Sequence, residues 1–194
     1  MSVLKKDDDI SDDQIISAVN AGDYEAFSSL VIRYQNMVFA LIMRQVADRE
    51  LAHDLSQEVF VKAYKGLRGF KSQAAFSTWL SRIAINHTHS YFSSKKYKQK
   101  TKTSTLNPEI HAQASTTDEA LEKEQQLLKL RTFVAQLSPT YREAIVLCSF
   151  EGKSYEQAAL ILKIPVGTVR SRLNRARALL KEAFNKEQQR RVER

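Results

Sequence analysis

Apolar residues recur every three or four positions along most of the chain, and few glycines or prolines interrupt them. Spacing of this kind places apolar side chains on one face of an α-helix, whereas a strand requires alternation by two. The clearest example predicts one amphipathic helix of about five turns and consists of Phe27, Leu30, Val31, Tyr34, Val38, Leu41 and Ile42. The pattern therefore predicts an all-α fold.

Three further helices are predicted in the first half of the chain. Residues 10–16 place capping side chains just ahead of an apolar face, and Gly22 then interrupts the chain, with Asp23 as the next N-cap. A second helix is expected from about Asp48 to Leu67 and a third from Phe76 to about Tyr97. The inner stripe of the helix from Asp48 is expected to consist of Leu51, Leu55, Val59 and Ala63.

Residues 98–120 differ from the sequence on either side. They are rich in Lys, Ser and Thr and poor in large apolar residues, which is typical of a flexible linker. Helical patterning resumes at residue 119 and continues to about 187. The sequence thus predicts two small helical domains, 1–97 and 121–194, joined by the linker 98–120.

The C-terminal domain contains a helix-turn-helix pattern. Ser154 and Gln157 form a capping box, and the short helix that they begin is expected to end near Leu162. Residues 163–167 make a turn, and a longer helix follows from about Thr168 past Leu180. The buried face of this second helix is expected to consist of Val169, Leu173, Ala176 and Leu180.

Polar donors gather on the opposite face of that second helix. Arg170, Ser171, Asn174 and Arg175 lie near its start, where the recognition helix of a helix-turn-helix meets base edges in the major groove. Arg172, Arg177 and Lys181 lie at the flanks, where phosphate contacts are expected. The alternative is a solvated basic face on an ordinary helical hairpin.

Charge supports a polyanionic partner. The chain has a formal net charge of +8 and a pI of about 9.6. Seven acidic residues and two lysines give residues 1–25 a net charge of −5, so the remainder carries +13. A basic body favours nucleic acid as a partner, although solubility alone is a simpler explanation.

The composition also indicates the cellular compartment of the protein. One cysteine, Cys148, allows neither an intrachain disulfide nor a cysteine zinc site, and it is expected to be a small core residue. The N-terminus is acidic, and no apolar run approaches about 18 residues. We therefore expect a cytoplasmic protein that does not span a membrane.

A second candidate site lies in the N-terminal domain, where aromatic and cationic residues alternate. Six lysines and arginines and no carboxylate occur from Arg82 to Lys102, and the aromatic residues nearby include Phe70, Phe76 and Trp79. Aromatic rings stack on bases and cations follow phosphates in proteins that bind single-stranded DNA. The alternative is that Phe76 and Trp79 are core residues and that the lysines form a solvated tail.

These segments resemble extracytoplasmic-function sigma factors of the sigma-70 family. DLSQEVFVKAY at 54–64 is similar to the helix with which the family binds core RNA polymerase, and FSTWLSRIAIN at 76–86 resembles its −10 reading and melting region. Its −35 reading region is matched by YREA at 141–144, EGKSY at 151–155 and IPVGTVRSRL at 164–173. The order and separation of the motifs match the family over nearly the whole chain.

The resemblance implies a role for each segment. The polymerase β′ clamp helices would bind the face formed by Asp54, Gln57, Glu58 and Val61. Without the resemblance, a solvated acidic face is the simpler interpretation of these residues. A flipped −10 base would be held by Lys62, Gly66, Phe70, Arg82, Ile83 and Asn86. The family also implies the β flap, promoter DNA and an anti-sigma factor as partners, the last often at the inner membrane.

Two other classes of protein share part of this pattern, a transcriptional regulator and an enzyme. A free-standing helix-turn-helix regulator is the main alternative, but it needs no polymerase-binding face. No nucleophile, phosphate-loop or metal motif indicates an enzyme, so we expect no catalysis, cofactor or small-molecule substrate. His87 and His89 face different sides of a helix and make a poor metal pair. These histidines and Ser81 depart from the family pattern, which leaves the promoter sequence open.

Overall fold

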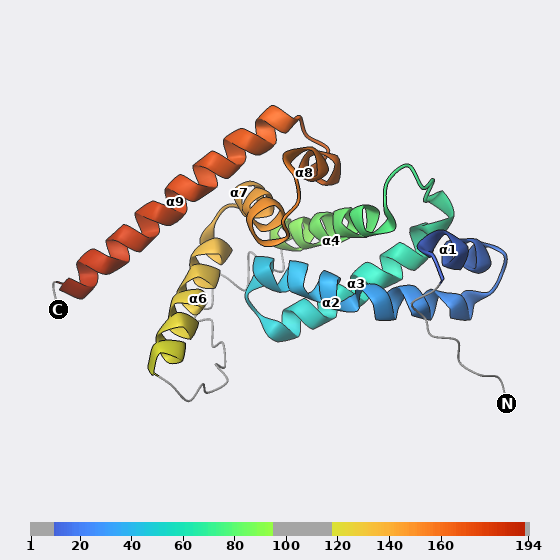
Figure 1. Cartoon of the computed structure of the whole chain (residues 1–194), viewed down its shortest axis with the longest axis horizontal. Helices are drawn as coiled ribbons and strands as arrows, with labels where there is room; N and C mark the ends of the chain where they lie inside the picture. The colour runs from blue at the N-terminus through green and yellow to red at the C-terminus, as the bar shows by residue number, and fades with distance from the viewer. Residues whose placement is uncertain (1–9, 95–117, 193–194) are drawn as a thin grey trace.

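The computed structural model describes residues 10–94 and 118–192, and within these ranges it contains helices and no strands. The all-α prediction is confirmed. In Figure 1 the chain forms an N-terminal group of helices, α1 to α4, and a C-terminal group, α6 to α9. The elements are α1 (Asp12–Asn20), η2 (Tyr24–Ala26), α2 (Phe27–Val46), α3 (Arg49–Gly66), η3 (Leu67–Gly69), α4 (Phe76–Ser93), α6 (Asp118–Gln136), α7 (Pro139–Ile145), η4 (Val146–Phe150), α8 (Tyr155–Leu162) and α9 (Val166–Val192).

Side chains cap the starts of α1, η2 and α3, whereas α2 and α4 begin without a side-chain cap. The Ser11 hydroxyl accepts a hydrogen bond from the Gln14 amide at 3.3 Å, and the Gln14 side chain accepts one from the Ser11 amide at 2.9 Å. Asp23 caps η2 and Asp48 caps α3 through their carboxylates. Each cap satisfies amides that the first helical turn leaves without a partner.

Helix α2 is the centre of the N-terminal group and packs against α1, α3 and α4. With η2 it forms a stretch, Tyr24–Val46, long and apolar enough by length and composition to cross a membrane, which the sequence analysis did not expect. Its stripe of Leu30, Val38 and Ile42 is buried against the neighbouring helices, while Arg33 and Arg44 form ion pairs. Both features are typical of the core helix of a helical bundle.

The C-terminal group departs from the predicted boundaries at two places. In the sequence, Ser138-Pro139 and Gly152 predict the start and the end of one helix, but in the structure α7 changes after Ile145 into the π-helical turn η4. The last helix begins at Val166, two residues before Thr168, because the amides of Thr168 and Val169 already donate to the Pro165 carbonyl. Prolines suit this position, since the first turn needs no amide there.

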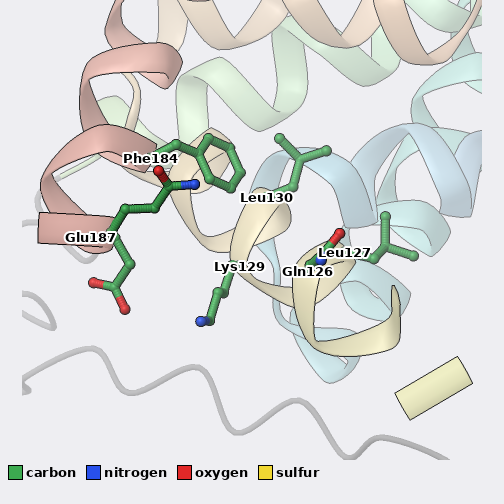
Figure 2. Close-up of a pocket in the computed structure, with 7 residues that line it drawn as sticks. Gln126, Leu127, Lys129, Leu130, Phe184 and Glu187 are labelled. Carbon is green, nitrogen blue, oxygen red and sulfur yellow. The ribbon is translucent and has the colours of Figure 1, made fainter. Parts of the chain in front are cut away.

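A groove of about 560 Å³ lies between α6 and α9 (Figure 2). Phe184 projects toward Leu130 across it, and Phe184 also packs edge-on against Phe133 at 4.8 Å. By its sequence spacing either Leu127 or Leu128 is expected to face inward, and Leu127 is 44% exposed at the edge of the groove. The groove is partly apolar, and its lining consists of Gln126, Leu127, Lys129, Leu130, Phe184, Glu187 and Gln188.

The segment that separates the two groups lies mainly outside the described residues. Helix α4 ends at Ser93, and the expected extension to Tyr97 falls on residues outside the description after Ser94. Of the predicted linker 98–120, residues 98–117 are not described, and residues 118–120 are the first of α6.

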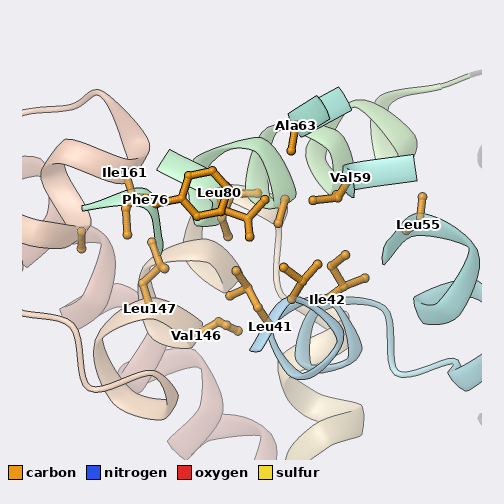
Figure 3. Packing of buried hydrophobic residues seen from close by; sticks show 14 of the residues in the cluster. Leu41, Ile42, Leu55, Val59, Ala63, Phe76, Leu80, Val146, Leu147 and Ile161 are labelled. Atoms are coloured by element: carbon orange, nitrogen blue, oxygen red, sulfur yellow. The ribbon is translucent and has the colours of Figure 1, made fainter. Parts of the chain in front are cut away.

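The buried apolar residues of both groups belong to one cluster (Figure 3). Leu41, Phe76 and Leu80 come from the N-terminal group, and Leu147 and Ile161 come from the C-terminal group. Helices α7 and α8 pack against α4, and α6 and η4 pack against α2. The two predicted domains are therefore in direct contact in this structure.

Candidate nucleic-acid and polymerase interfaces

The helix-turn-helix is formed by α8 and α9, with a turn shorter than predicted. Ser154 and Gln157 make the expected capping box at 3.0 and 3.2 Å. Lys163 ends α8 in a left-handed conformation, with φ of 54°, and the Ile164 amide donates to the Ala159 carbonyl. Pro165 follows and prevents α8 from continuing. This geometry redirects the chain into α9.

Helix α9 has the two faces that the sequence predicts. Val169, Leu173 and Ala176 are fully buried against α7 and α8, and Leu180 is nearly so. On the other side, all four predicted base-reading residues are exposed: Arg170, Ser171, Asn174 and Arg175. Among the predicted phosphate contacts Arg177 and Lys181 are exposed and Arg172 is half-buried. The face is thus available to duplex DNA.

Tyr155 contributes to this face, although the sequence analysis gave it no role. The guanidinium carbon of Arg170 lies 6.0 Å from the centroid of the Tyr155 ring, at the limit of a cation–π contact. Glu156 lies beside the same pair: a backbone amide, the Ser154 hydroxyl and the Arg170 charge lower the pKa of its carboxyl. The start of α8 is therefore adjacent to Arg170, the first of the candidate base-reading residues of α9.

In the N-terminal group, the predicted −10 residues are contiguous. Trp79, Arg82, Ile83 and Asn86 occupy positions i, i+3, i+4 and i+7 of α4 and share one stripe. The indole of Trp79 covers Gly66 of α3, with its Cζ2 atom 3.5 Å from the Cβ position of that glycine. Lys62 lies one turn before Gly66 on the same face of α3. The end of α3 and the middle of α4 therefore form one surface.

An aromatic cluster completes that surface. The Phe70 ring lies 5.2 Å from Trp79 and 5.7 Å from Phe76. Phe76 is buried, whereas Trp79 and Phe70 are half-buried, so the core interpretation fits Phe76 fully and Trp79 in part. The Nε atom of Arg82 is enclosed and has no hydrogen-bond partner among the described residues.

Comparison with known proteins matches both regions. Residues 30–97 match the family described as Sigma-70 region 2, and residues 127–180 match the one described as Sigma-70, region 4. The RNA polymerase sigma-H factor of Pseudomonas aeruginosa is 36% identical over 180 residues, which cover 89% of this chain and 93% of the relative. The chain belongs to the extracytoplasmic-function sigma factors of the sigma-70 family. Its function is therefore to direct RNA polymerase to promoters. The match covers region 2 as well as the helix-turn-helix, which favours a sigma factor over a free-standing regulator.

Other relatives agree with this family assignment. The ECF RNA polymerase sigma-E factor of Escherichia coli K12 is 36% identical over 175 residues, covering 87% of this chain and 91% of the relative. A solved structure of the sigma factor RpoE with the anti-sigma factor NepR from Bartonella quintana has a TM-score of 0.65 at 27% identity, over 82% of this chain and 96% of that one. CnrH, solved with the cytosolic domain of CnrY, shares the fold at a TM-score of 0.60 and 24% identity, over 88% and 95% of the two chains.

The candidate polymerase-binding face of this sigma factor lies on α3. Asp54, Gln57, Glu58 and Val61 are all exposed on one side of the helix, and Val61 is 52% exposed. Glu58 also has a partner that no sequence pattern predicts: its Oε2 lies 2.6 Å from Nε2 of His87, on α4. The acidic face of α3 and the helix that carries the candidate −10 residues are therefore in contact through this pair.

The residues that depart from the family pattern have structural partners. His87 faces α3, whereas His89 faces α7, so the two rings diverge as predicted. Ser81 is buried and donates to the Ser77 carbonyl at 2.7 Å.

Cys148 is partly buried beside the core, and burial raises the pKa of its thiol. Among the described residues no group of three or more His, Cys, Asp or Glu is placed to hold a metal ion.

Proposed function

We propose that this sigma factor divides its work among three surfaces. The α3 face of Asp54, Gln57, Glu58 and Val61 binds the β′ clamp helices of core polymerase. The surface around Trp79 holds a flipped −10 base, and its residues are Lys62, Gly66, Phe70, Arg82, Ile83 and Asn86. The exposed face of α9 reads the −35 duplex through Arg170, Ser171, Asn174 and Arg175, with Arg172, Arg177 and Lys181 on phosphates.

The single observation that carries the proposal is the two-faced helix α9. Three of its buried positions are fully enclosed, so its orientation is fixed by the core. The opposite positions carry arginine and asparagine side chains that make bidentate bonds to guanine and adenine. Exposed donors on a rigid helix after a tight turn are what major-groove reading requires.

The −10 surface supports the second part of the proposal. Flipping a base out of a duplex costs a few kcal/mol, which stacking and hydrogen bonds to the base edge can offset. Phe70 offers a half-buried ring within an aromatic cluster, and Asn86 offers an exposed amide on the same surface. Neither side chain is needed to read duplex at −35.

We further propose the domain limits 1–97, 98–120 and 121–194, with the β flap contacting the last domain. An anti-sigma partner is also proposed, because the related RpoE was solved in complex with NepR. The protein would act in the cytoplasm, where such a partner could hold it at the inner membrane. It would perform no catalysis of its own and would use no cofactor.

The test is run-off transcription with purified core polymerase on a matching promoter, which should require both components. Asp54→Lys should reduce holoenzyme formation, because it reverses charge on an exposed α3 side chain. Glu25→Lys makes the same charge change outside this face and should leave core binding intact. Unchanged core affinity in Asp54→Lys, with unchanged unfolding free energy, would remove that residue from the interface.

A further inference from the structure

The segment 70–75, which joins η3 to α4, begins with the ring that is proposed to stack on the flipped base. Phe70 is half-buried, but residues 71–75 are all exposed, so the core does not hold the middle of the segment in place. Ser72 has a left-handed backbone conformation, with φ of 50°. This conformation costs free energy for a residue other than glycine and persists where other contacts hold it. The segment therefore needs support from another element.

That support comes from the first helix of the chain. The Ser72 hydroxyl donates a hydrogen bond at 3.0 Å to Oδ1 of Asp13, which lies in the first turn of α1. Helix α1 also packs against η3, directly before Phe70, and Figure 1 shows α1 at the same end of the N-terminal group as η3. Helix α1 therefore contacts both the segment and the turn that precedes it.

Helix α1 is itself held firmly on the N-terminal group. Asp12, the neighbour of Asp13, accepts hydrogen bonds from the Arg33 guanidinium at 2.6 Å and from the Tyr34 hydroxyl, both on α2. Arg33 also donates to the Ile10 carbonyl at 2.8 Å. The inner face of α1 is buried and consists of Ile15, Ile16 and Val19. Asp13 is therefore presented to Ser72 by a helix whose position is fixed.

Aromatic packing joins the two ends of the segment. The Phe70 ring lies 5.7 Å from the ring of Phe76, with which α4 begins. Phe76 in turn lies 5.4 Å from the ring of Tyr34, whose hydroxyl donates to Asp12 of α1. The ends of the segment are thus packed on the core, and the Ser72–Asp13 hydrogen bond ties its exposed middle to α1.

We propose that Asp13 is a positioning residue for −10 recognition: through Ser72 it holds the segment 70–75 in the conformation in which Phe70 receives the flipped base. The inference rests on the proposed function of the surface around Trp79. Ordering a mobile segment on binding costs free energy, so a ring that is already in place captures the base more tightly. Releasing Ser72 should therefore weaken capture of the single strand, although no group that touches the base is removed.

The test measures the affinity of the holoenzyme for a single-stranded oligonucleotide that carries the non-template −10 element of a matching promoter. Ser72→Ala removes the donor and Asp13→Ala removes the acceptor. Each should lower this affinity by about twofold to tenfold, the net range for one hydrogen bond. The double variant should lose no more than either single variant, because both changes break the same bond. Affinities for core polymerase and for a −35 duplex should match wild type.

Two further variants separate the hydrogen bond from the loss of a negative charge. Asp13→Asn keeps an acceptor oxygen and should retain more of the single-strand affinity than Asp13→Ala. Glu25→Ala removes an exposed carboxylate of η2 outside this contact and should behave as wild type. A loss in Glu25→Ala equal to that in Asp13→Ala would assign the effect to net charge and overturn the proposal.

A bond that only stabilises the fold gives a different result. Ser72→Ala would then lower the free energy of unfolding but leave single-strand affinity unchanged, and this outcome would overturn the positioning role. Additive losses in the double variant would overturn it as well, since they would show that the two residues act independently.

Phe70→Ala distinguishes failure of this inference from failure of the proposed function. If Phe70→Ala loses single-strand affinity and Ser72→Ala does not, the surface holds the base but α1 does not position it. If Phe70→Ala also keeps the wild-type affinity, the proposed −10 surface is itself wrong.

Discussion

The carboxylate of Asp12 connects the first helix, α1, to α2. Asp12 of α1 accepts hydrogen bonds from two residues of α2: the Arg33 guanidinium at 2.6 Å and the Tyr34 hydroxyl. Burial, and then the Asp12 hydrogen bond and charge, raise the pKa of Tyr34 to about 12. The composition shows the acidic N-terminus only as a cluster of charge. Asp12, one residue of that cluster, has a specific structural role.

Tyr34→Phe should lower the free energy of unfolding by about 1–2 kcal/mol, because a hydrogen bond to a charged group is lost while Arg33 still pairs with Asp12. Denaturant unfolding measures this. The folded state keeps the Tyr34 proton that the unfolded state releases near pH 10, so wild type should lose stability relative to the variant between pH 10 and 12. Tyr24→Phe, at an exposed tyrosine, should change neither the free energy of unfolding nor its dependence on pH. If the unfolding free energies of Tyr34→Phe and wild type changed equally between pH 10 and 12, the hydrogen bond from Tyr34 to Asp12 would be contradicted.

At the scale of elements, periodicity and caps predicted most helices well. The apolar stripe of α9 and the capping box of α8 are local patterns, so the sequence contains all that defines them. The π-helical turn η4 was missed because the apolar spacing of Val146, Leu147 and Phe150 does not distinguish a π-helical turn from an α-helix. The predicted extension of α4 to Tyr97 falls on residues outside the described part of the chain, so it stays a prediction beyond Ser94. Local signals therefore predict faces better than boundaries.

Arg170→Ala should weaken holoenzyme binding to a matching −35 element by about 1–3 kcal/mol and relax specificity at one base pair. Tyr155→Ala should give a smaller loss at the same base pair, because it removes only the ring that supports Arg170. Binding to promoters substituted at each −35 position measures both effects. Losses that are uniform across all positions would show that Arg170 contacts phosphate rather than a base.

Asn86→Ala should impair promoter opening more than closed-complex binding, because in the proposed division of surfaces only α9 contacts the −35 duplex. Opening requires unstacking that costs a few kcal/mol for a flipped base. A promoter already mismatched at −10 should therefore restore part of the transcription by this variant. Gln73→Ala, at an exposed polar residue outside the stripe, should behave as wild type. If mismatching gave no rescue and permanganate footprints matched wild type, Asn86 would be structural.

At the scale of the whole molecule, the sequence predicted two domains but not their contact. The Arg142–Gln45 bond joins residues 97 apart, and the Arg44–Glu151 pair joins residues 107 apart. No periodicity or spacing rule reaches across such separations, and Arg142 in a YREA motif carries no sign of its acceptors. Family resemblance alone groups the candidate −10 residues in the sequence. The structure shows in addition that the Trp79 ring contacts both Gly66 and Phe70. Contacts between elements far apart in sequence therefore required coordinates.

The charge asymmetry of the whole chain leads to a final prediction about salt. The body of the chain carries a net charge of +13 behind an acidic N-terminus, and a strongly basic protein attracts the polyanionic DNA backbone. Each phosphate contact releases counterions, so the logarithm of affinity falls with the logarithm of salt by about 0.9 per phosphate. Arg177→Ala and Lys181→Ala should each reduce that slope by about 0.9 for the holoenzyme, with similar losses on matched and scrambled −35 elements. Lys186→Ala removes a charge already paired with Glu182 on the same helix and should keep the wild-type slope. Titration over a series of salt concentrations measures the slopes, and an unchanged slope for Arg177→Ala and Lys181→Ala would place the phosphate path on another face of α9.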